Sequence, residues 1–182
     1  MPRPKKKKLL IIDGYNIINS WEELSELAND ELDSAREKLI DYMIEYSKYM
    51  SIKAIIVFDA YNVKNSADRE IKRADSLKVV YTKENQTADS YIEKYISNIP
   101  NKRNIEISVA TSDQAEQQIV LGKGGSRITA RELELDILKA KEAIRKHKSL
   151  ATGRKTIQRN TLEDRVNDDV MSKLEEIRRR TK

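Results

Sequence analysis

Short apolar runs alternate with longer amphipathic stretches along this chain. Four of the runs are rich in β-branched residues and are bounded by polar positions, a pattern typical of buried strands. They are KLLIID (8–13), KAIIVFDA (53–60), KVVYT (78–82) and NIEISVATS (104–112). Because each run is too short for an ordinary helix, we interpret all four as strands.

Four of the longer stretches carry apolar side chains at steps of three and four residues, which predicts amphipathic helices. They span residues 29–50, 87–99, 112–122 and 128–147. Polar residues at their starts predict N-terminal caps, namely Asn29 or Asp30, then Thr87, Ser112 and Thr129. Glu132 follows Thr129 at the spacing of a capping box, and Pro100 and Gly122 mark the ends of the second and third helices.

This order of elements predicts an α/β fold in which a mainly parallel sheet has helices on both faces. In such sheets, ligands bind beyond the carboxyl ends of the strands. Four aspartates fall at those ends: Asp13 and Asp59 end the first two strands, Asp89 lies in the first turn of the helix after the third, and Asp113 follows the fourth. The sequence therefore predicts that four carboxylates, far apart along the chain, crowd one edge of the sheet.

Each of these aspartates also has a purely structural explanation. Asp89 and Asp113 are suited to capping a helix start, and Asp59 is suited to forming a turn. Capping does not require coincident placement at four strand ends, however, and crowded carboxylates repel unless a divalent cation compensates them. The chain has no cysteine, and its single histidine, His147, lies at a helix end, so oxygen ligands favour Mg²⁺ or Mn²⁺.

The segment LLIIDGYNII places four further residue types next to one another around the first aspartate. Gly14 permits a close approach of the backbone, and the Asn16 amide can donate to a phosphate oxygen without adding negative charge. The Tyr15 ring is suited either to stacking on a base or to packing in the core. Ile17 and Ile18 then return the chain to the core.

Several segments together resemble one known family. LLIIDGYNII, VFDAYN, TADSYIE and VATSDQAEQQIVLGKGGSRITARELE are similar to the NYN-domain proteins of the YacP group, relatives of the PIN-type nucleases. The resemblance covers about residues 8–147. It implies a PIN-like α/β fold and metal-dependent endonucleolytic cleavage of messenger RNA in association with the ribosome. Matched segment by segment, the acidic site falls on Asp13, Asp89 and Asp113, with Asn16 beside it and Asp59 as a further metal ligand.

The charge of the chain is distributed unevenly. The net charge is +5, yet the first eight residues carry five basic side chains and no acid, and residues 149–182 carry nine basic and six acidic ones. The body between them is therefore net −3, which suits a protein that holds a cation and meets a polyanion with its ends. The expected RNA contacts are Lys5, Lys6, Lys7, Lys8, Lys123, Arg127 and Arg131. A lysine-rich terminus also has a simpler explanation, which is solubility.

We expect three regions: a basic arm (1–8), a nuclease domain (9–148) and a basic tail (149–182) with a linker near Thr152 and Gly153 and a narrow amphipathic helix over about 162–179. The apolar run after the basic start is too short for a signal peptide or a membrane span, so we expect a cytoplasmic protein that does not enter a membrane. The segment GKGGSR (122–127) lacks the residue order of a phosphate-binding loop, and we interpret it as a helix end and turn.

Three other functions remain open at this point. A phosphoacceptor receiver module would explain Asp13 and Asp59, but it needs an acidic pair where this chain has Asp13 followed by glycine. A non-catalytic module that binds RNA or the ribosome would keep the fold without needing Asp13, Asp89 and Asp113 together. A DNA flap nuclease would need further acids and a longer threading segment. The sequence leaves the oligomeric state undetermined.

Overall fold

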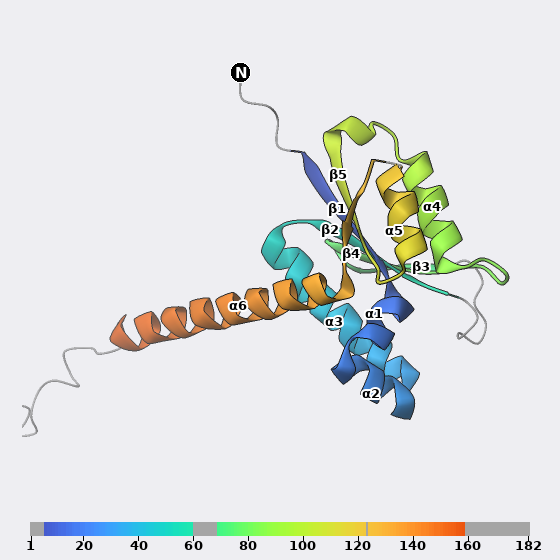
Figure 1. Cartoon of the computed structure of the whole chain (residues 1–182). Helices are drawn as coiled ribbons and strands as arrows, with labels where there is room; N and C mark the ends of the chain where they lie inside the picture. Colours follow the sequence, from blue (N-terminus) through green and yellow to red (C-terminus); the bar gives the residue numbers. More distant parts are fainter. Residues whose placement is uncertain (1–5, 60–68, 123, 159–182) are drawn as a thin grey trace, which may run out of the picture. The chain divides into compact units, whose positions relative to one another are not determined.

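The computed structural model describes residues 6–59, 69–122 and 124–158 (Figure 1). Lys5, Lys123 and the helix expected over 162–179 lie outside the described residues. Within the described part of the chain, no helix is both long enough and apolar enough to cross a membrane.

A six-stranded sheet forms the centre of the domain, with strand order β3-β4-β2-β1-β5-β6. Five strands run parallel, and β3 pairs antiparallel with β4 at one edge. The strands are β1 (Lys7–Asp13), β2 (Lys53–Phe58), β3 (Arg69–Ala74), β4 (Leu77–Tyr81), β5 (Ile105–Ala110) and β6 (Ser126–Ile128). This arrangement confirms the mainly parallel α/β sheet that the sequence predicts.

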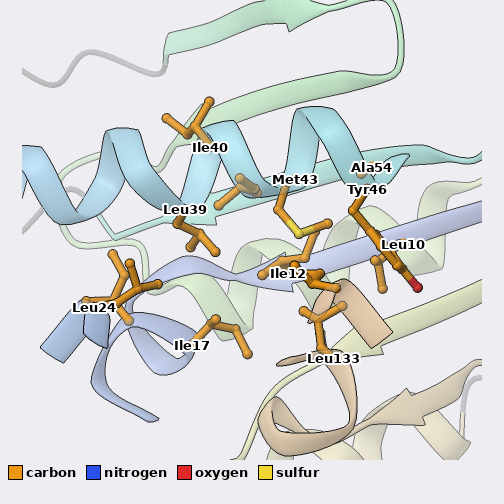
Figure 2. Close-up of a cluster of buried hydrophobic side chains, with 14 of the residues drawn as sticks. Leu10, Ile12, Ile17, Leu24, Leu39, Ile40, Met43, Tyr46, Ala54 and Leu133 are labelled. Atoms are coloured by element: carbon orange, nitrogen blue, oxygen red, sulfur yellow. The ribbon is translucent and has the colours of Figure 1, made fainter. Parts of the chain in front are cut away.

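Helices cover both faces of the sheet, because alternate side chains of each strand are buried on opposite sides. On one face Leu10, Ile12 and Ile56 pack against α1 (Gly14–Ser20), α2 (Glu22–Asp30), α3 (Leu32–Met50) and the start of α6 (Ala130–Gln158) (Figure 2). On the other face Ile11 and Val57 pack against α4 (Ala88–Asn98) and α5 (Gln114–Gly122) (Figure 1). A short 3₁₀ turn, η2 (Lys102–Asn104), precedes β5.

The four predicted strands correspond to β1, β2, β4 and β5, whereas β3 and β6 were not predicted. The β3 sequence, REIKRA, contains a single large apolar residue, because this edge strand is covered poorly on both faces. β6 has three residues, Ser126–Ile128, and forms because β5 offers it a free edge. Part of the segment interpreted as a helix end and turn is thus a strand.

Two short helices, α1 and α2, occupy the segment between the first predicted strand and helix, and they too were not predicted. The predicted cap at Asn29 or Asp30 is wrong, since both residues lie in α2 and α3 begins after Glu31. Ser112 is also not the residue before α5, which begins at Gln114. The Thr87 cap is confirmed, because its hydroxyl oxygen accepts from the Ser90 amide at 3.2 Å.

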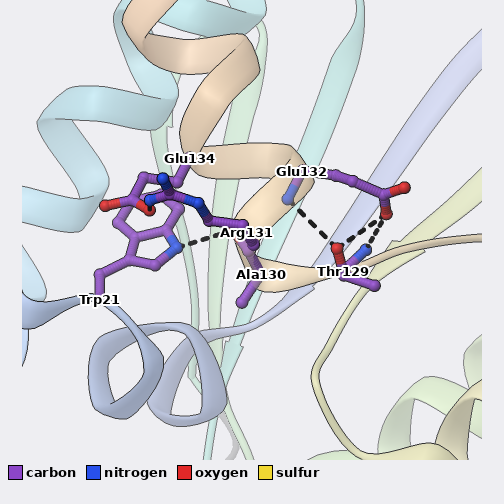
Figure 3. Close-up of polar contacts among 6 residues, drawn as sticks. All are labelled: Trp21, Thr129, Ala130, Arg131, Glu132 and Glu134. Atoms are coloured by element: carbon purple, nitrogen blue, oxygen red, sulfur yellow. Dashed lines mark hydrogen bonds and ion pairs between the residues drawn. The ribbon is translucent and has the colours of Figure 1, made fainter.

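The start of α6 forms the predicted capping box. The Thr129 amide donates to Glu132 Oε2 at 2.7 Å, and the Glu132 amide donates to Thr129 Oγ1 at 3.2 Å (Figure 3). The Nε1 of buried Trp21 donates to the Ala130 carbonyl at 2.8 Å and fixes this end of α6 to the α1–α2 junction.

The predicted linker near Thr152 and Gly153 is wrong, because both residues lie within α6, which continues to Gln158. Contacts divide the chain into one unit that ends at Lys141 and a second that begins at Glu142. The sheet, its two cores and the residues discussed below as a site all belong to the first unit.

Candidate active site at the carboxyl edge of the sheet

The carboxyl ends of the parallel strands bring the four predicted aspartates to one edge. Asp13 is the last residue of β1, and Asp59 directly follows β2. Asp89 is the second residue of α4, which follows β4, and Asp113 lies between β5 and α5. β4, β2, β1 and β5 are consecutive neighbours in the sheet, so the segments that carry the four aspartates all begin at the same edge.

Asp13 is the buried member of the group. Its residue surface is 8% exposed, and burial is the main cause that raises the pKa of its carboxyl from 3.8 to about 6. Neighbouring Asp89 and Asp59 raise this pKa further, whereas the backbone hydrogen bond from Asn16 opposes the rise. The backbone N–H of Asn16 donates to Asp13 Oδ1 at 3.1 Å, so Asp13 also caps the N-terminus of α1.

Asp89 connects the remaining carboxylates electrostatically. Loss of solvent raises the pKa of its carboxyl, and Asp113 and Asp59 raise it further. Together with the repulsion between Asp13 and its neighbours, these effects join all four aspartates in one acidic group. The structure thus places the four aspartates at one edge, where Asp13 and Asp89 each feel two of the other carboxylates.

The donor atoms of this group suit a hard divalent cation. Carboxylate oxygens are the ligands that Mg²⁺ and Mn²⁺ prefer, and buried Asp13, beside two further acids, has its charge disfavoured in a way that a cation would relieve. Among the described residues, however, no three acidic, histidine or cysteine side chains are already arranged closely enough to hold an ion. The chemistry of the group fits a cation, and binding one requires the carboxylates to draw together.

Asn16 fixes the loop that carries Asp113. Its Oδ1 accepts a hydrogen bond of 2.7 Å from the Ser112 amide, 96 positions along the chain. The Asp113 amide donates to Thr111 Oγ1 at 3.1 Å, so two successive amides of the loop are held. Asn16 therefore positions the loop through its side-chain oxygen. Its Nδ2 group can still donate to a phosphate oxygen, as the sequence suggests.

Two buried polar residues behind this loop were missed by the sequence analysis. Gln117 Nε2 donates to the Thr111 carbonyl at 2.9 Å, and Gln117 Oε1 accepts from Arg127 Nη1 at 2.9 Å. Arg127 is thereby tied to the loop that precedes Asp113. The sequence contained one weak signal for this network, which is a glutamine on the core side of α5.

The aromatic residues beside Asp13 pack with one another. The Tyr15 and Phe58 ring centroids lie 5.1 Å apart, and Phe58 stacks on Tyr81 at 5.6 Å. A Cβ atom at Gly14 would lie 2.3 Å from Phe58 Cε1, so glycine is required there by the aromatic core. Tyr15 thus packs rather than presenting an open stacking face, and among the described residues its buried hydroxyl has no hydrogen-bond partner.

The predicted basic contacts are not gathered at the acidic edge. Lys7 and Lys8 begin β1, so they lie at the amino edge of the sheet, and Lys8 Nζ is 3.8 Å from Glu106 Oε2. Asp13 lies six residue steps along the strand from Lys7, a span of about 20 Å. Arg131, in the first turn of α6, pairs with Glu134 at 2.6 Å. Of the described basic candidates, Arg127 alone is connected to the loop beside the acids.

The α/β architecture and its acidic carboxyl edge are consistent with a nuclease-type fold. The model of the YacP-like NYN domain matches residues 10–179, so the chain belongs to this family. It is 35% identical over 158 residues to the Bacillus subtilis strain 168 protein named "Uncharacterized protein YacP", covering 87% of this chain and 91% of that protein.

Solved structures of the Bacillus subtilis protein share this fold. The crystal structure of Rae1 (YacP) superposes with a TM-score of 0.71 at 34% identity, covering 94% of both chains. The crystal structure of a tryptophan-to-leucine mutant of the same protein gives a TM-score of 0.67 at 36% identity, covering 79% of this chain and 82% of that one. The predicted family and fold are therefore confirmed.

Proposed function

We propose that this protein is a metal-dependent endoribonuclease that cleaves messenger RNA, in association with the ribosome. The observation that carries the proposal is the group of four aspartates at the carboxyl edge, where the neighbouring carboxylates add to burial in raising the pKa of Asp13 and of Asp89. Such a group costs the fold stability and is explained by a cation that the active protein holds.

Asp13, Asp89 and Asp113 would hold the cation, with Asp59 as a further ligand. When bound, Mg²⁺ or Mn²⁺ neutralises phosphate charge and lowers the pKa of a coordinated water. The chain's own contribution is positioning. The α1 cap holds Asp13 in place, and the Asn16 and Thr111 hydrogen bonds hold the loop before Asp113.

The ribosome enters the proposal through the family resemblance, and the distribution of charge is compatible with it. The acidic body repels a free RNA strand, so a partner that presents the strand would raise the local concentration of substrate at the acidic edge. The described part of the basic start, Lys7 and Lys8, lies at the amino edge of the sheet, opposite the aspartates. It is therefore suited to contacting ribosomal RNA while the acidic edge acts on the message.

A cleavage assay with matched variants tests the proposal. Asp13→Asn, Asp89→Asn and Asp113→Asn are each expected to reduce cleavage of labelled RNA by at least about 100-fold, since each removes charge from the group that holds the cation. Asp41→Asn, at an exposed position of α3, is the control with the same charge change and is expected to retain full activity.

The assay compares naked RNA, naked DNA and ribosome-bound RNA, each with Mg²⁺, Mn²⁺ or EDTA. We expect weak cleavage of naked RNA, stronger cleavage of ribosome-bound RNA and none in EDTA. Equal cleavage of naked and bound RNA would remove the ribosome from the proposal. RNA binding without cleavage under every condition would instead identify a non-catalytic binding module.

A further inference from the structure

We propose that the exposed face of the β3–β4 hairpin, together with a tyrosine pair on α4, is a binding track for single-stranded RNA that leads to the acidic edge. The inference deepens the proposed function and rests on it, because it names the surface that carries the substrate strand. The track is defined by Tyr91 and Tyr95 and by the lysines Lys53, Lys72, Lys78, Lys83 and Lys94.

The tyrosine pair offers flat aromatic faces beside the acidic edge. Tyr91 and Tyr95 lie one helical turn apart on α4, with ring centroids 6.0 Å apart and planes inclined by 20°. Both residues are partly exposed and line a groove of about 440 Å³, together with Lys83 and Lys94. Aromatic faces next to basic side chains are what proteins use to bind single strands without reading their sequence.

A second groove lies on the other side of this tyrosine pair's Tyr95, which lines both grooves. It has a volume of about 460 Å³ and is lined by Lys53, Lys72 and Lys78, and it shares Tyr95 with the first groove. The first groove includes residues of the β4–α4 loop, while the second reaches the turn between β3 and β4. Since β4 runs from the amino edge to the carboxyl edge, the two grooves together connect the edges of the sheet.

The strand register places two of these lysines directly opposite each other. Lys72 of β3 and Lys78 of β4 are Cα partners in the antiparallel pair, on the face where Val80 packs with the α4 core. Like charges opposite each other destabilise a sheet pair. Exposed acids compensate them locally, since Lys72 pairs with Asp75 at 2.6 Å and Lys78 with Glu70 at 3.3 Å. An RNA backbone that passes between the two lysines would offset their mutual repulsion, which the fold alone does not favour.

The carboxyl end of the track is anchored beside the aspartates. Buried Thr82 donates from Oγ1 to the Gln86 carbonyl at 2.7 Å and from its amide to the Phe58 carbonyl at 2.9 Å. These bonds hold the β4–α4 loop against the end of β2, and the residue after Phe58 is Asp59. A strand lying on Tyr91 and Lys83 is thereby directed toward Asp59 and Asp89.

The charge of the track differs from that of the rest of the body. Its five lysines face three acids, Glu70, Asp75 and Glu84, whereas residues 9–148 as a whole are net −3. A positive strip on an acidic body attracts an RNA backbone to one path and repels it elsewhere.

Binding of a fluorescently labelled single-stranded RNA to the full-length protein tests this proposal. The titrations are done in EDTA, so that binding is measured without cleavage. Tyr91→Leu combined with Tyr95→Leu should raise Kd about 5- to 100-fold, which corresponds to the loss of one stacked base. Tyr49→Leu, at an exposed tyrosine of α3, is the control and should leave Kd unchanged.

The lysines are tested by the salt dependence of the same binding. Lys72→Ser combined with Lys78→Ser should reduce the slope of log K against log salt by about 1.4, since each phosphate contact to a single strand contributes about 0.7. The control is Lys139→Ser combined with Lys146→Ser on α6, which removes the same charge. It should reduce the slope by less than the Lys72 and Lys78 changes do.

A variant that keeps the aromatic faces separates stacking from folding. Tyr91→Phe combined with Tyr95→Phe should bind as the wild type does, even if the leucine variant is less stable in thermal unfolding. Unchanged Kd in the leucine and serine variants overturns the track, whatever the cleavage assay gives. Equal losses in the phenylalanine and leucine variants overturn stacking, and an equal loss in the Tyr49 control shows that the effect is not local.

If the track variants bind and cleave RNA as the wild type does, the track is rejected and the proposed nuclease activity is unaffected. Conversely, weakened binding in the track variants, combined with a wild-type protein that cleaves nothing, supports the track and rejects the nuclease.

Discussion

At the scale of single residues, the Asp13 side chain accepts a hydrogen bond from the Asn16 amide while it lies buried beside Asp59 and Asp89. Ionisation strengthens the hydrogen bond but is opposed by burial and by the two neighbouring carboxylates. The balance raises the pKa of the Asp13 carboxyl to about 6. In the absence of a cation, the folded state therefore holds the Asp13 proton more tightly than the unfolded chain.

This difference sets the sign of a pH dependence. Below pH 3.8 the carboxyl is protonated in both states. As the pH rises from 3.8 to about 6, the unfolded chain ionises before the folded state does, so the folded state loses stability relative to the unfolded chain. In EDTA, the free energy of unfolding of the wild type should fall by up to about 3 kcal/mol between pH 4 and pH 7. Asp13→Asn, which keeps a side-chain cap but cannot ionise, should lack this fall and be the more stable protein at pH 7.

Urea denaturation at a series of pH values measures both proteins, with Asp41→Asn as the control for a lost surface charge. Added Mg²⁺ should restore stability to the wild type at pH 7 but less to Asp13→Asn, because an ion that binds the native state stabilises it. Parallel pH profiles of the wild type and Asp13→Asn would show that this carboxyl does not carry the effect.

At the scale of elements, the junction between β1 and α1 depends on the absence of a side chain at Gly14. The backbone turns from strand to helix directly against β2, and an added Cβ would lie 2.3 Å from Phe58 Cε1 and 3.0 Å from Ile56 Cγ2. Phe58 has little room to move, because Tyr15 packs on it and Tyr81 stacks on it. The junction that carries Asp13 is therefore fixed by packing between elements.

Gly14→Ala should lower the free energy of unfolding by about 1 to 3 kcal/mol, the usual cost of overpacking a core. The matched control is Gly122→Ala at the last residue of α5, where an added Cβ meets nothing within 4 Å. That variant should be unchanged or gain up to about 1 kcal/mol from helix propensity. Urea midpoints with unchanged m values measure both. Equal stability of the two variants would mean that the Phe58 ring moves aside easily.

At the scale of the whole sheet-containing unit, acidic and basic residues lie at opposite edges. Asp13 ends β1 at the carboxyl edge, while Lys7 and Lys8 begin it at the amino edge. Leu9, the next residue, is the Cα partner of Lys53, where the proposed RNA track ends. A strand held by the basic start of the chain would thus enter the track at the amino edge and leave it beside the aspartates.

Replacing Lys5 to Lys8 with serine should weaken binding to RNA or ribosomes. Four lysines contact at most four phosphates, so the slope of log K against log salt should fall by about 2 to 3. Cleavage at saturating substrate should be nearly unchanged, because about 20 Å of strand separates these lysines from Asp13. Titrations at several salt concentrations, together with cleavage rates, measure the two effects. Identical slopes for the wild type and the serine variant would mean that these lysines only keep the protein soluble.

Local sequence determined the features that depend on neighbours along the chain. Apolar runs produced β1, β2, β4 and β5, because a strand buried on both faces needs apolar residues at every position. Thr87 and Thr129 cap their helices as predicted, because a cap acts over three residues. The placement of the aspartates at one edge followed from one further rule, that parallel strands end at the same edge.

Tertiary structure decided the features that depend on distant partners. β3 and β6 form because neighbouring strands offer free edges, which their own polar or short sequences do not reveal. The role of Asn16 in holding the Ser112 amide depends on a contact across 96 positions. Hydrophobic periodicity and capping therefore determined the main elements and the acidic edge from sequence alone. Long-range hydrogen bonds and side-chain packing, which leave no local pattern, decided how the edge is held and which face carries the lysines and tyrosines of the track.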